Sequence, residues 1–215
     1  VVIRADREWM PLGNSSGIQA GSILDFSGNL ERPAGKYGFL KVANGHFEFS
    51  GRPGVPVRFY GVNIVGDVHF MENQEIDRVA DEFAATGYNL VRFHHFDNYL
   101  KRKGEKSTVL DPERMDRLDY WIAALKKRGI YVTFDLYTSR RLTKGEIPEY
   151  PDAAIGGNEY KALVFVNENA RRNFKEFSLN LLNHVNPYTG VAWKEERAIA
   201  NLSLLNEDSI YATVD

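Results

Sequence analysis

The sequence contains no cysteine, no long apolar run and no block of like charges. The absence of cysteine excludes disulfide bonds and thiolate metal sites, and it leaves the redox compartment open. No apolar stretch approaches the ~20 residues that a transmembrane helix needs. A formal net charge of -2 gives no sign of the basic surface that binds nucleic acid or an anionic membrane. We therefore predict no nucleic-acid partner and no membrane partner.

The composition that remains is that of a globular domain. Of the 215 residues, 43% are hydrophobic and 13% are aromatic, which is enough to fill one sizeable core and argues against disorder. The chain begins at Val1 rather than at Met. This start predicts a processed or cropped chain from which any signal peptide has been lost. Residues 1–35 are broken by proline and glycine and predict an irregular lead-in, with a possible short strand at Ser22–Phe26.

A β-hairpin is the first clear element. The pair Asn44-Gly45 is the strongest two-residue hairpin signal, and it lies between the predicted strands Gly38–Val42 and His46–Phe49. After Phe49 the turn residues Arg52-Pro53-Gly54 direct the chain into a third predicted strand, Val57–Val62. We expect a small β-meander that leads directly into the main fold.

Strands and helices then alternate along the chain. Each helix is marked by an apolar stripe with capping residues, and each strand by a short apolar or β-branched run. This alternation predicts a parallel sheet with right-handed crossovers, closed either as an open doubly wound sheet or as a barrel. The predicted strands are Val57–Ile64, Asn89–Phe93, Ile130–Leu136 and Ile199–Asn206, and the predicted helices are Asn73–Thr86, Asp111–Gly129 and Asn167–Val185.

The ends of these strands favour the barrel. No Gly-rich phosphate loop follows any of them, and each ends instead in large polar side chains, as barrel enzymes do at their catalytic edge. A full barrel needs roughly 250 residues, so the chain would hold only half of one. We predict an α/β fold in which a β-hairpin or meander (1–56) precedes the first four βα units of a TIM (β/α)8 barrel (57–215). The polar strand-end residues are Asn63, Arg92, His94, His95, Asp135, Tyr137, Asn206 and Glu207.

Strand alternation indicates which of these side chains share a face. Arg92 and His94 point to one side of their strand, and Asp135 and Tyr137 point to one side of the next. On the last strand, alternation places Glu207 on the same face as Ser203 and Leu205, and Asn206 on the opposite face. Arg92, Asp135 and Glu207 would then converge around one mouth.

Glu207 is the candidate catalytic carboxylate. Partial burial at a strand end raises the pKa of a carboxyl group, and a nearby cation lowers it again, so such a site can be tuned for general acid work. An exposed carboxylate at the start of a loop, engaged in a salt bridge, is the alternative. For Arg92 the alternative is a purely structural ion pair.

A metal site deserves a separate test. His94 and His95 are adjacent, and adjacent residues of a strand point to opposite faces, so the pair cannot easily share one ion. A metal site of His94, Asp135 and Glu207 is geometrically conceivable and would fit a metal-dependent barrel hydrolase or isomerase. We predict no metal and no cofactor. The pair Arg140-Arg141 is expected to be a solvated loop charge.

These motifs, taken in order, resemble glycoside hydrolase clan A, and most closely the cellulase-like family 5 barrels. The resemblance covers roughly residues 36–211. It rests on Gly61-Val62-Asn63 at the end of the first strand, on the second strand, which reads Asn89-Leu90-Val91-Arg92-Phe93-His94-His95, and on Leu205-Asn206-Glu207 at the end of the fourth. The segment Asn186-Pro187-Tyr188-Thr189-Gly190 is also similar to members of the family.

The resemblance implies a retaining glycosidase that acts on a β-linked poly- or oligosaccharide. Glu207 would be the general acid/base, and Asn206 would bind the 2-hydroxyl of the sugar. Arg92 would hold the nucleophile ionised and oriented. The substrate site would also be lined by His94 or His95 and by Asn63, Asp135 and Tyr137. The resemblance also implies an extracellular or periplasmic location.

Two departures from the family pattern stand out. Tyr137 occupies a position where many relatives carry histidine, and Asp208 follows Glu207 where proline is common. The nucleophile glutamate of the seventh strand is missing from this fragment, so we expect residues 1–215 alone to be inactive. Because half a barrel exposes two sheet edges, we also expect the half-barrel to self-associate. A non-catalytic carbohydrate-binding protein on a degenerate barrel is the alternative function.

Overall fold

A computed structural model describes residues 17–207, which begin with a short irregular segment and a three-stranded antiparallel sheet. Its strands are β1 (Leu40–Ala43), β2 (His46–Phe49) and β3 (Arg52–Val57). Between β1 and β2 the backbone is left-handed at both turn residues, with φ of 51° at Asn44 and 77° at Gly45. Two positive φ values in a two-residue loop match the twist of the flanking strands, so the predicted hairpin is confirmed.

The third strand differs from its prediction. We expected Val57–Val62, but β3 ends at Val57 and the next strand begins only at Gly61. The residues Arg52-Pro53-Gly54, which we had predicted to form a turn, lie inside β3. Because β3 is an edge strand of the order β1-β2-β3, a proline lacking an N–H group does not disrupt the sheet.

Ser22–Phe26 does not form the strand that we allowed for. The segment is a turn around Asp25, whose carboxylate accepts hydrogen bonds from the backbone N–H of Gly21 (2.7 Å) and of Ser27 (3.0 Å). An aspartate that binds nearby backbone groups in this way competes with strand pairing.

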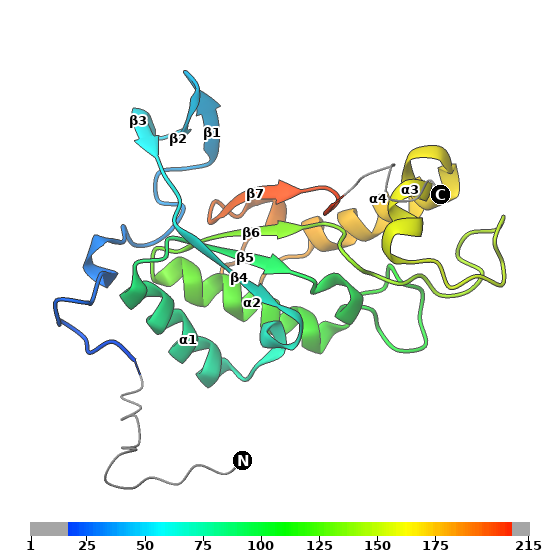
Figure 1. Cartoon of the computed structure of the whole chain (residues 1–215), viewed down its shortest axis with the longest axis horizontal. Helices are drawn as coiled ribbons and strands as arrows, with labels where there is room; N and C mark the ends of the chain where they lie inside the picture. The colour runs from blue at the N-terminus through cyan, green and yellow to red at the C-terminus, as the bar shows by residue number, and fades with distance from the viewer. Residues whose placement is uncertain (1–16, 208–215) are drawn as a thin grey trace, which may run out of the picture.

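The main body is a four-stranded parallel sheet in the order β4-β5-β6-β7, as predicted from the alternation of strands and helices (Figure 1). Each strand is shorter than or shifted from its predicted range by a few residues. The strands are β4 (Gly61–Val65), β5 (Leu90–His94), β6 (Tyr131–Asp135) and β7 (Ile199–Ser203), and the helices are α1 (Asn73–Thr86), α2 (Pro112–Lys127), α3 (Gly157–Val166) and α4 (Glu168–Asn183).

Capping residues account for the helix boundaries. The Asp111 side chain accepts from the backbone N–H of Glu113 and caps α2, and Asn167 caps α4 in the same way through Ala170. Gly87 ends α1 with a left-handed φ of 87°. Helix α3 was not predicted, because its hydrophobic residues do not form a clear stripe.

The helices cover only one face of the parallel sheet. Side chains of α1, α2 and α4 pack with alternate residues of β5 and β6 in one core, which includes Ile76, Val91, Phe93, Leu118, Trp121, Ile122, Val132, Phe134 and Phe177. The other face carries a row of polar residues in register, Asn63, Arg92, Thr133 and Asn201. One covered face and one open face are what a section of barrel wall presents.

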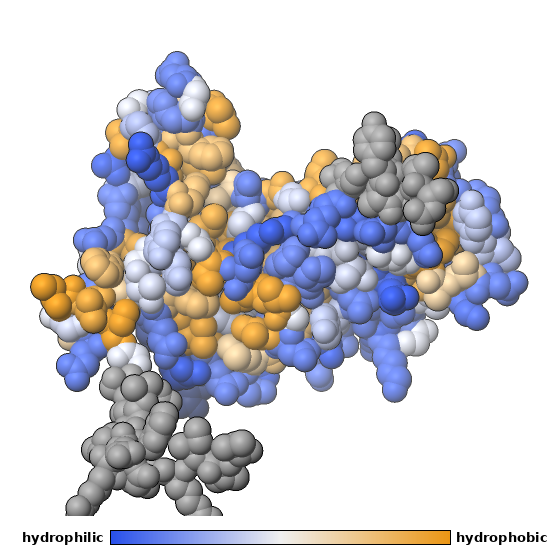
Figure 2. Space-filling view, viewed as in Figure 1, coloured by the Kyte–Doolittle hydropathy of each residue, from blue (hydrophilic) through white to orange (hydrophobic). Residues whose placement is uncertain are grey.

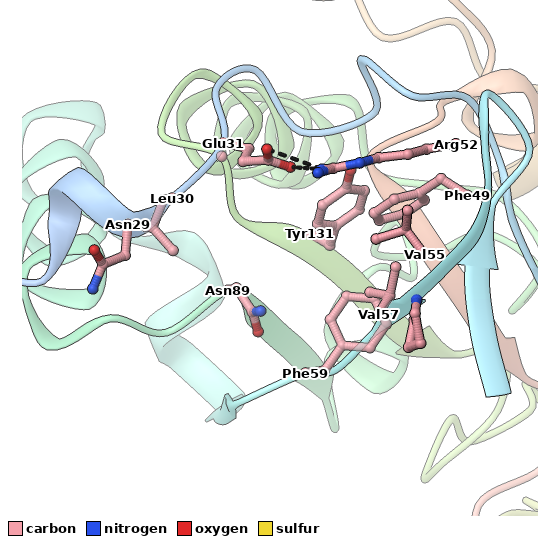
Figure 3. Close-up of a pocket in the computed structure, with 12 residues that line it drawn as sticks. Asn29, Leu30, Glu31, Phe49, Arg52, Val55, Val57, Phe59, Asn89 and Tyr131 are labelled. Atoms are coloured by element: carbon pink, nitrogen blue, oxygen red, sulfur yellow. Dashed lines mark hydrogen bonds and ion pairs between the residues drawn. The ribbon is translucent and has the colours of Figure 1, made fainter.

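A hollow of about 230 Å³ lies at the N-terminal edge of this sheet, under the β1–β3 sheet (Figure 3). Phe49, Phe59 and Tyr131 line it, and an ion pair between Glu31 and Arg52 (3.0 Å) spans it. Figure 2 shows apolar residues continuing from the β1–β3 sheet onto the body below. In parallel barrels this edge serves stability, and chemistry lies at the opposite edge.

Within residues 17–207 no helix is long and apolar enough to cross a membrane.

The open edges predict self-association. Within the described part of the chain, β4 and β7 each have a partner strand on one side only. Unpaired backbone N–H and C=O groups along such an edge favour pairing with another chain. We expect sedimentation velocity of the 215-residue chain to show a concentration-dependent dimer or larger species. Val65→Lys places a charge on the edge strand β4 and should reduce the proportion of this associated species. Ile23→Lys, in an exposed turn, should leave that proportion unchanged. A monomer at every concentration would contradict this expectation.

A buried histidine lies in the loop that follows β4. His69, in the short 3-10 helix Gly66–Phe70, is fully buried, and its Nδ1 donates to the carbonyl of Gly66 (2.8 Å). The rings of Phe93 and Phe96 lie 5.4 and 5.8 Å away. Burial lowers the pKa of His69 to about 4 from its ordinary 6.5, since a charged imidazolium is disfavoured there. Its Nε2 has no hydrogen-bond partner within the described residues.

This histidine makes stability fall in acid. Because the unfolded chain binds the proton more tightly, the contribution of neutral His69 is complete above pH 6.5 and is lost as pH falls towards 4. The full difference is about 3 kcal/mol. We expect urea unfolding to show that the free energy of unfolding falls between pH 7 and pH 4.5 in both proteins. The fall should be about 2–3 kcal/mol greater for the wild type than for His69→Phe. An equal loss in both proteins would show that His69 does not set this pH dependence.

Candidate active site

The C-terminal ends of β5 and β6 bring three polar residues together. Asp135 is fully buried at the end of β6, and its carboxylate accepts hydrogen bonds from Nη2 of Arg92 at 2.8 and 3.0 Å. Its Oδ2 also lies 2.8 Å from Nδ1 of His94. The predicted grouping of Arg92 and His94 on one face of β5 is confirmed. Because both oxygens of Asp135 are engaged, this carboxylate orients its two partners and does not itself face solvent.

Asn206 connects the end of β7 to this cluster. Its backbone N–H donates to the carbonyl of Tyr137 (3.0 Å), and its Oδ1 accepts from Nη2 of Arg92 (2.9 Å). Strand alternation had placed Asn206 on the face away from Glu207. That extrapolation is not valid because β7 ends at Ser203 and the chain turns before Asn206. The Asn206 side chain is buried, and its Nδ2 has no partner within residues 17–207.

Glu207 follows directly and is exposed. The partial burial that we expected at a strand end is not observed, because the strand stops four residues earlier. Its backbone is left-handed, with φ of 51°. A left-handed conformation is unfavourable for a residue other than glycine, and such residues cluster at functional sites.

His95 shows the same backbone feature, with φ of 56°. This turn of the chain places its ring 4.1 Å from the ring of His94, so the expectation that the two histidines point apart is wrong. The Nδ1 of His95 lies 3.3 Å from Oγ of Ser139, in the loop after β6. Both histidines therefore lie beside the cluster of Arg92 and Asp135.

Two further predicted site residues, Tyr137 and Asn63, contribute no side-chain hydrogen bond to this cluster within residues 17–207. The Tyr137 side chain is fully buried. Its ring lies tilted against that of Tyr160 (4.7 Å between ring centroids), and its hydroxyl donates to the carbonyl of Arg140 (3.0 Å). Burial raises the pKa of Tyr137 well above its ordinary value, so the hydroxyl stays protonated. Only its backbone carbonyl reaches the cluster, because β6 ends at Asp135 and alternation stops there. Asn63 is exposed in the middle of β4, level with Arg92 and one layer below the strand ends.

Arg140 is fully buried, against the expectation of a solvated loop charge. Its guanidinium donates to Ser107, to the Tyr160 hydroxyl (3.3 Å) and to Oδ1 of Asn173 (2.9 Å), and it lies 4.3 Å from the centroid of the Phe177 ring. These contacts join the loop after β6 to α4 and to the loop after β5. No local sequence signal separates Arg140 from its exposed neighbour, since all of these partners are distant in the chain.

No group of three or more His, Asp or Glu side chains within the described residues is arranged to hold a metal ion. His94 and Asp135 are joined to each other by a hydrogen bond instead. The cluster therefore offers an exposed carboxylate, a buried amide and an oriented arginine at the C-terminal edge of a parallel sheet.

Comparison with known proteins identifies the family to which the parallel sheet and its helices belong. The model of the family "Cellulase (glycosyl hydrolase family 5)" matches residues 51–195, which include β4 to β6 and α1 to α4. A protein of Oryza sativa subsp. japonica, whose name places it among the mannan endo-1,4-beta-mannosidases, is 27% identical over 180 residues. That alignment covers 80% of this chain and 36% of the rice protein.

Solved structures show the same fold. The endo-1,4-beta-mannanase of Rhizomucor miehei superposes with a TM-score of 0.57 at 19% identity, over 79% of this chain and 48% of its own. The endo-beta-1,4-mannanase of Thermotoga petrophila superposes with a TM-score of 0.52 at 25% identity. This match covers 72% of this chain and 36% of the Thermotoga chain. The chain thus spans less than half the length of each of these relatives. It belongs to glycosyl hydrolase family 5 and forms part of the (β/α)8 barrel of that family.

Proposed function

We propose that the protein carrying this chain hydrolyses a β-linked polysaccharide, with Glu207 as the general acid/base. The observation that carries the proposal is the geometry of Asn206. It is held by Arg92 through its side chain and by the turn after β6 through its backbone, and the exposed Glu207 follows it directly. Membership of glycosyl hydrolase family 5 supports the same reaction class.

Glu207 would act twice in a retaining reaction. Its carboxylic acid would protonate the glycosidic oxygen as the bond breaks, and its carboxylate would then deprotonate the attacking water. The Nδ2 of Asn206 would donate to the 2-hydroxyl of the sugar, a contact that strengthens in an oxocarbenium-like transition state. Among residues 17–207 this buried Nδ2 has no hydrogen-bond partner, which supports the assignment, since a buried donor left unpaired is costly.

A retaining reaction also needs a second carboxylate, about 5–5.5 Å from the first. We assign it to sequence outside residues 1–215. All three described hydrogen bonds of Arg92 come from its Nη2, and its side chain is 33% exposed, so Nη1 and Nε are available to that carboxylate. A guanidinium at this position would keep the nucleophile ionised and oriented.

The names of the relatives support a choice of substrate. The rice, Rhizomucor and Thermotoga proteins are all named as acting on β-1,4-linked mannan. We therefore propose β-1,4-mannan as the preferred substrate, with β-1,4-glucan as the comparison substrate. An extracellular or periplasmic location would suit a polymeric substrate of this kind.

Removal of the acid/base should abolish most turnover. In the full-length protein that contains this chain, we expect Glu207→Gln to lower kcat on β-mannan about 10²- to 10⁴-fold, measured by release of reducing ends. Glu168→Gln, which changes an exposed carboxylate on α4, is the matched control and should be unchanged. The loss should shrink for aryl glycosides, whose leaving group needs no proton. Unchanged turnover in Glu207→Gln would contradict the assignment, and sugar binding without cleavage by the wild type would favour a non-catalytic binding protein.

Residues 1–215 alone should not turn over substrate. Because the second carboxylate would be absent, the purified chain is expected to show no release of reducing ends from β-mannan or β-glucan above that of Glu207→Gln in the same chain. Measurable turnover that depends on Glu207 would show that the described residues already contain a complete site.

A further inference from the structure

We propose that Asp97 is the positioning residue that sets the location of Asn206 and Glu207. This inference rests on the proposed function of Glu207. Asp97 begins the short 3-10 helix Asp97–Tyr99 after β5, and its carboxylate is fully buried. It touches no group proposed to contact the sugar, and it acts through the turn that follows β6.

Three consecutive backbone amides converge on this carboxylate. The N–H groups of Thr138 (2.8 Å), Ser139 (3.0 Å) and Arg140 (2.9 Å) all donate to Oδ2 of Asp97. The hydroxyl of Thr138 donates to Oδ1. Successive amides around one anion fix the dihedral angles of the segment that carries them, because each bond needs its N–H to point at the same atom. Asp97 therefore determines the shape of the turn 138–140.

This turn bears on Asn206 directly. The carbonyl of Tyr137, the residue just before the turn, accepts the backbone N–H of Asn206 at 3.0 Å. On the other side Arg92 holds the side-chain oxygen of Asn206 at 2.9 Å. Asn206 is thus fixed at two points, of which one depends on the turn. A shift of the turn moves the backbone of Asn206, and with it the adjacent Glu207.

A second path leads from the same carboxylate to the histidines. The hydroxyl of Ser139 lies 3.3 Å from Oδ1 of Asp97 and 3.3 Å from Nδ1 of His95. His95 has a left-handed backbone and needs such support, because that conformation is unfavourable for it. Its ring lies against His94, which is hydrogen-bonded to Asp135. Asp97 thus supports both sides of the candidate site.

The rest of the loop has its own anchor. The Arg140 guanidinium is fixed by Tyr160 and Asn173, and Glu146 accepts from the N–H of Thr143 and from Nδ2 of Asn173. None of these bonds involves the carboxylate of Asp97. A change at Asp97 is therefore expected to alter the turn and the site while the outer part of the loop stays in place.

Asp97→Asn tests the inference in the full-length protein. We expect kcat on β-mannan to fall about 10- to 100-fold with KM within about twofold, since a displacement of about 1 Å at the chemistry costs this much. The matched control is Asp119→Asn. Asp119 is an equally buried carboxylate, on α2, that accepts from Nε1 of Trp193 (2.7 Å) and contacts His184 (2.6 Å) away from the site. The Asp119→Asn substitution should lower the thermal stability of the protein and leave kcat unchanged.

A readout independent of activity is the hydrogen exchange of the Asn206 amide in the same full-length protein. It should accelerate at least tenfold in Asp97→Asn and stay unchanged in Asp119→Asn. Thr138→Val removes one hydroxyl bond to Asp97 and keeps the backbone amide, so it should give a smaller loss of kcat in the same direction even where Asp97→Asn fails to fold. Equal effects of Asp97→Asn and Asp119→Asn on kcat, or no effect of Asp97→Asn and Thr138→Val on Asn206 exchange, would overturn the inference. Absence of turnover in the wild type would instead overturn the proposed function, and the exchange result would still report on Asp97.

Discussion

The ion pair between Arg92 and Asp135 is the contact on which the candidate site depends. Asp135 is fully buried, and a carboxylate without water is stable only when charged or hydrogen-bonding groups surround it. Arg92 and His94 meet this need from the neighbouring strand. Arg92 then has a fixed orientation, and it uses the same Nη2 atom to hold Asn206, in the segment after β7. One buried charge thus organises side chains from β5, β6 and the segment after β7.

The parallel sheet explains why these residues meet. Parallel strands end at the same edge, so a polar residue at each C-terminal end reaches the others without any long excursion of the chain. Helices cover the outer face, and the inner face carries the polar row that includes Asn63 and Thr133. The hollow at the N-terminal edge, under the β1–β3 sheet, lies away from these polar strand ends (Figure 3).

Local signals in the sequence were sufficient for most of the fold. The two-residue turn at Asn44-Gly45, the cap at Asp111 and the glycine after α1 each depend on a few neighbouring residues, and each prediction was confirmed. Of the predicted strand-end residues, His94 and Asp135 are the last residues of β5 and β6. The family resemblance, drawn from Arg92 and from the Asn206-Glu207 pair, was confirmed by the match over residues 51–195.

The orientation of residues beyond the strand ends could not be predicted. Alternation applies only while the backbone is extended, and it failed at His95, at Tyr137 and at Asn206, each of which lies just past the end of a strand. The burial of Arg140 depends on partners as distant as Asn173 and could not be read from its neighbours. Long-range contacts of this kind decide the fine geometry of the site, whereas periodicity and caps decide the elements.

The most direct measurement of the central claim is a crystal structure of the full-length protein, inactivated at a second carboxylate, with a bound β-1,4-mannan oligosaccharide. We expect a Glu207 oxygen to lie within about 3 Å of a glycosidic oxygen and Nδ2 of Asn206 to donate to the 2-hydroxyl of the adjoining sugar. A second carboxylate should lie about 5–5.5 Å from Glu207, next to Arg92. An oligosaccharide bound away from the ends of β5 to β7, with Glu207 facing solvent, would contradict these expectations.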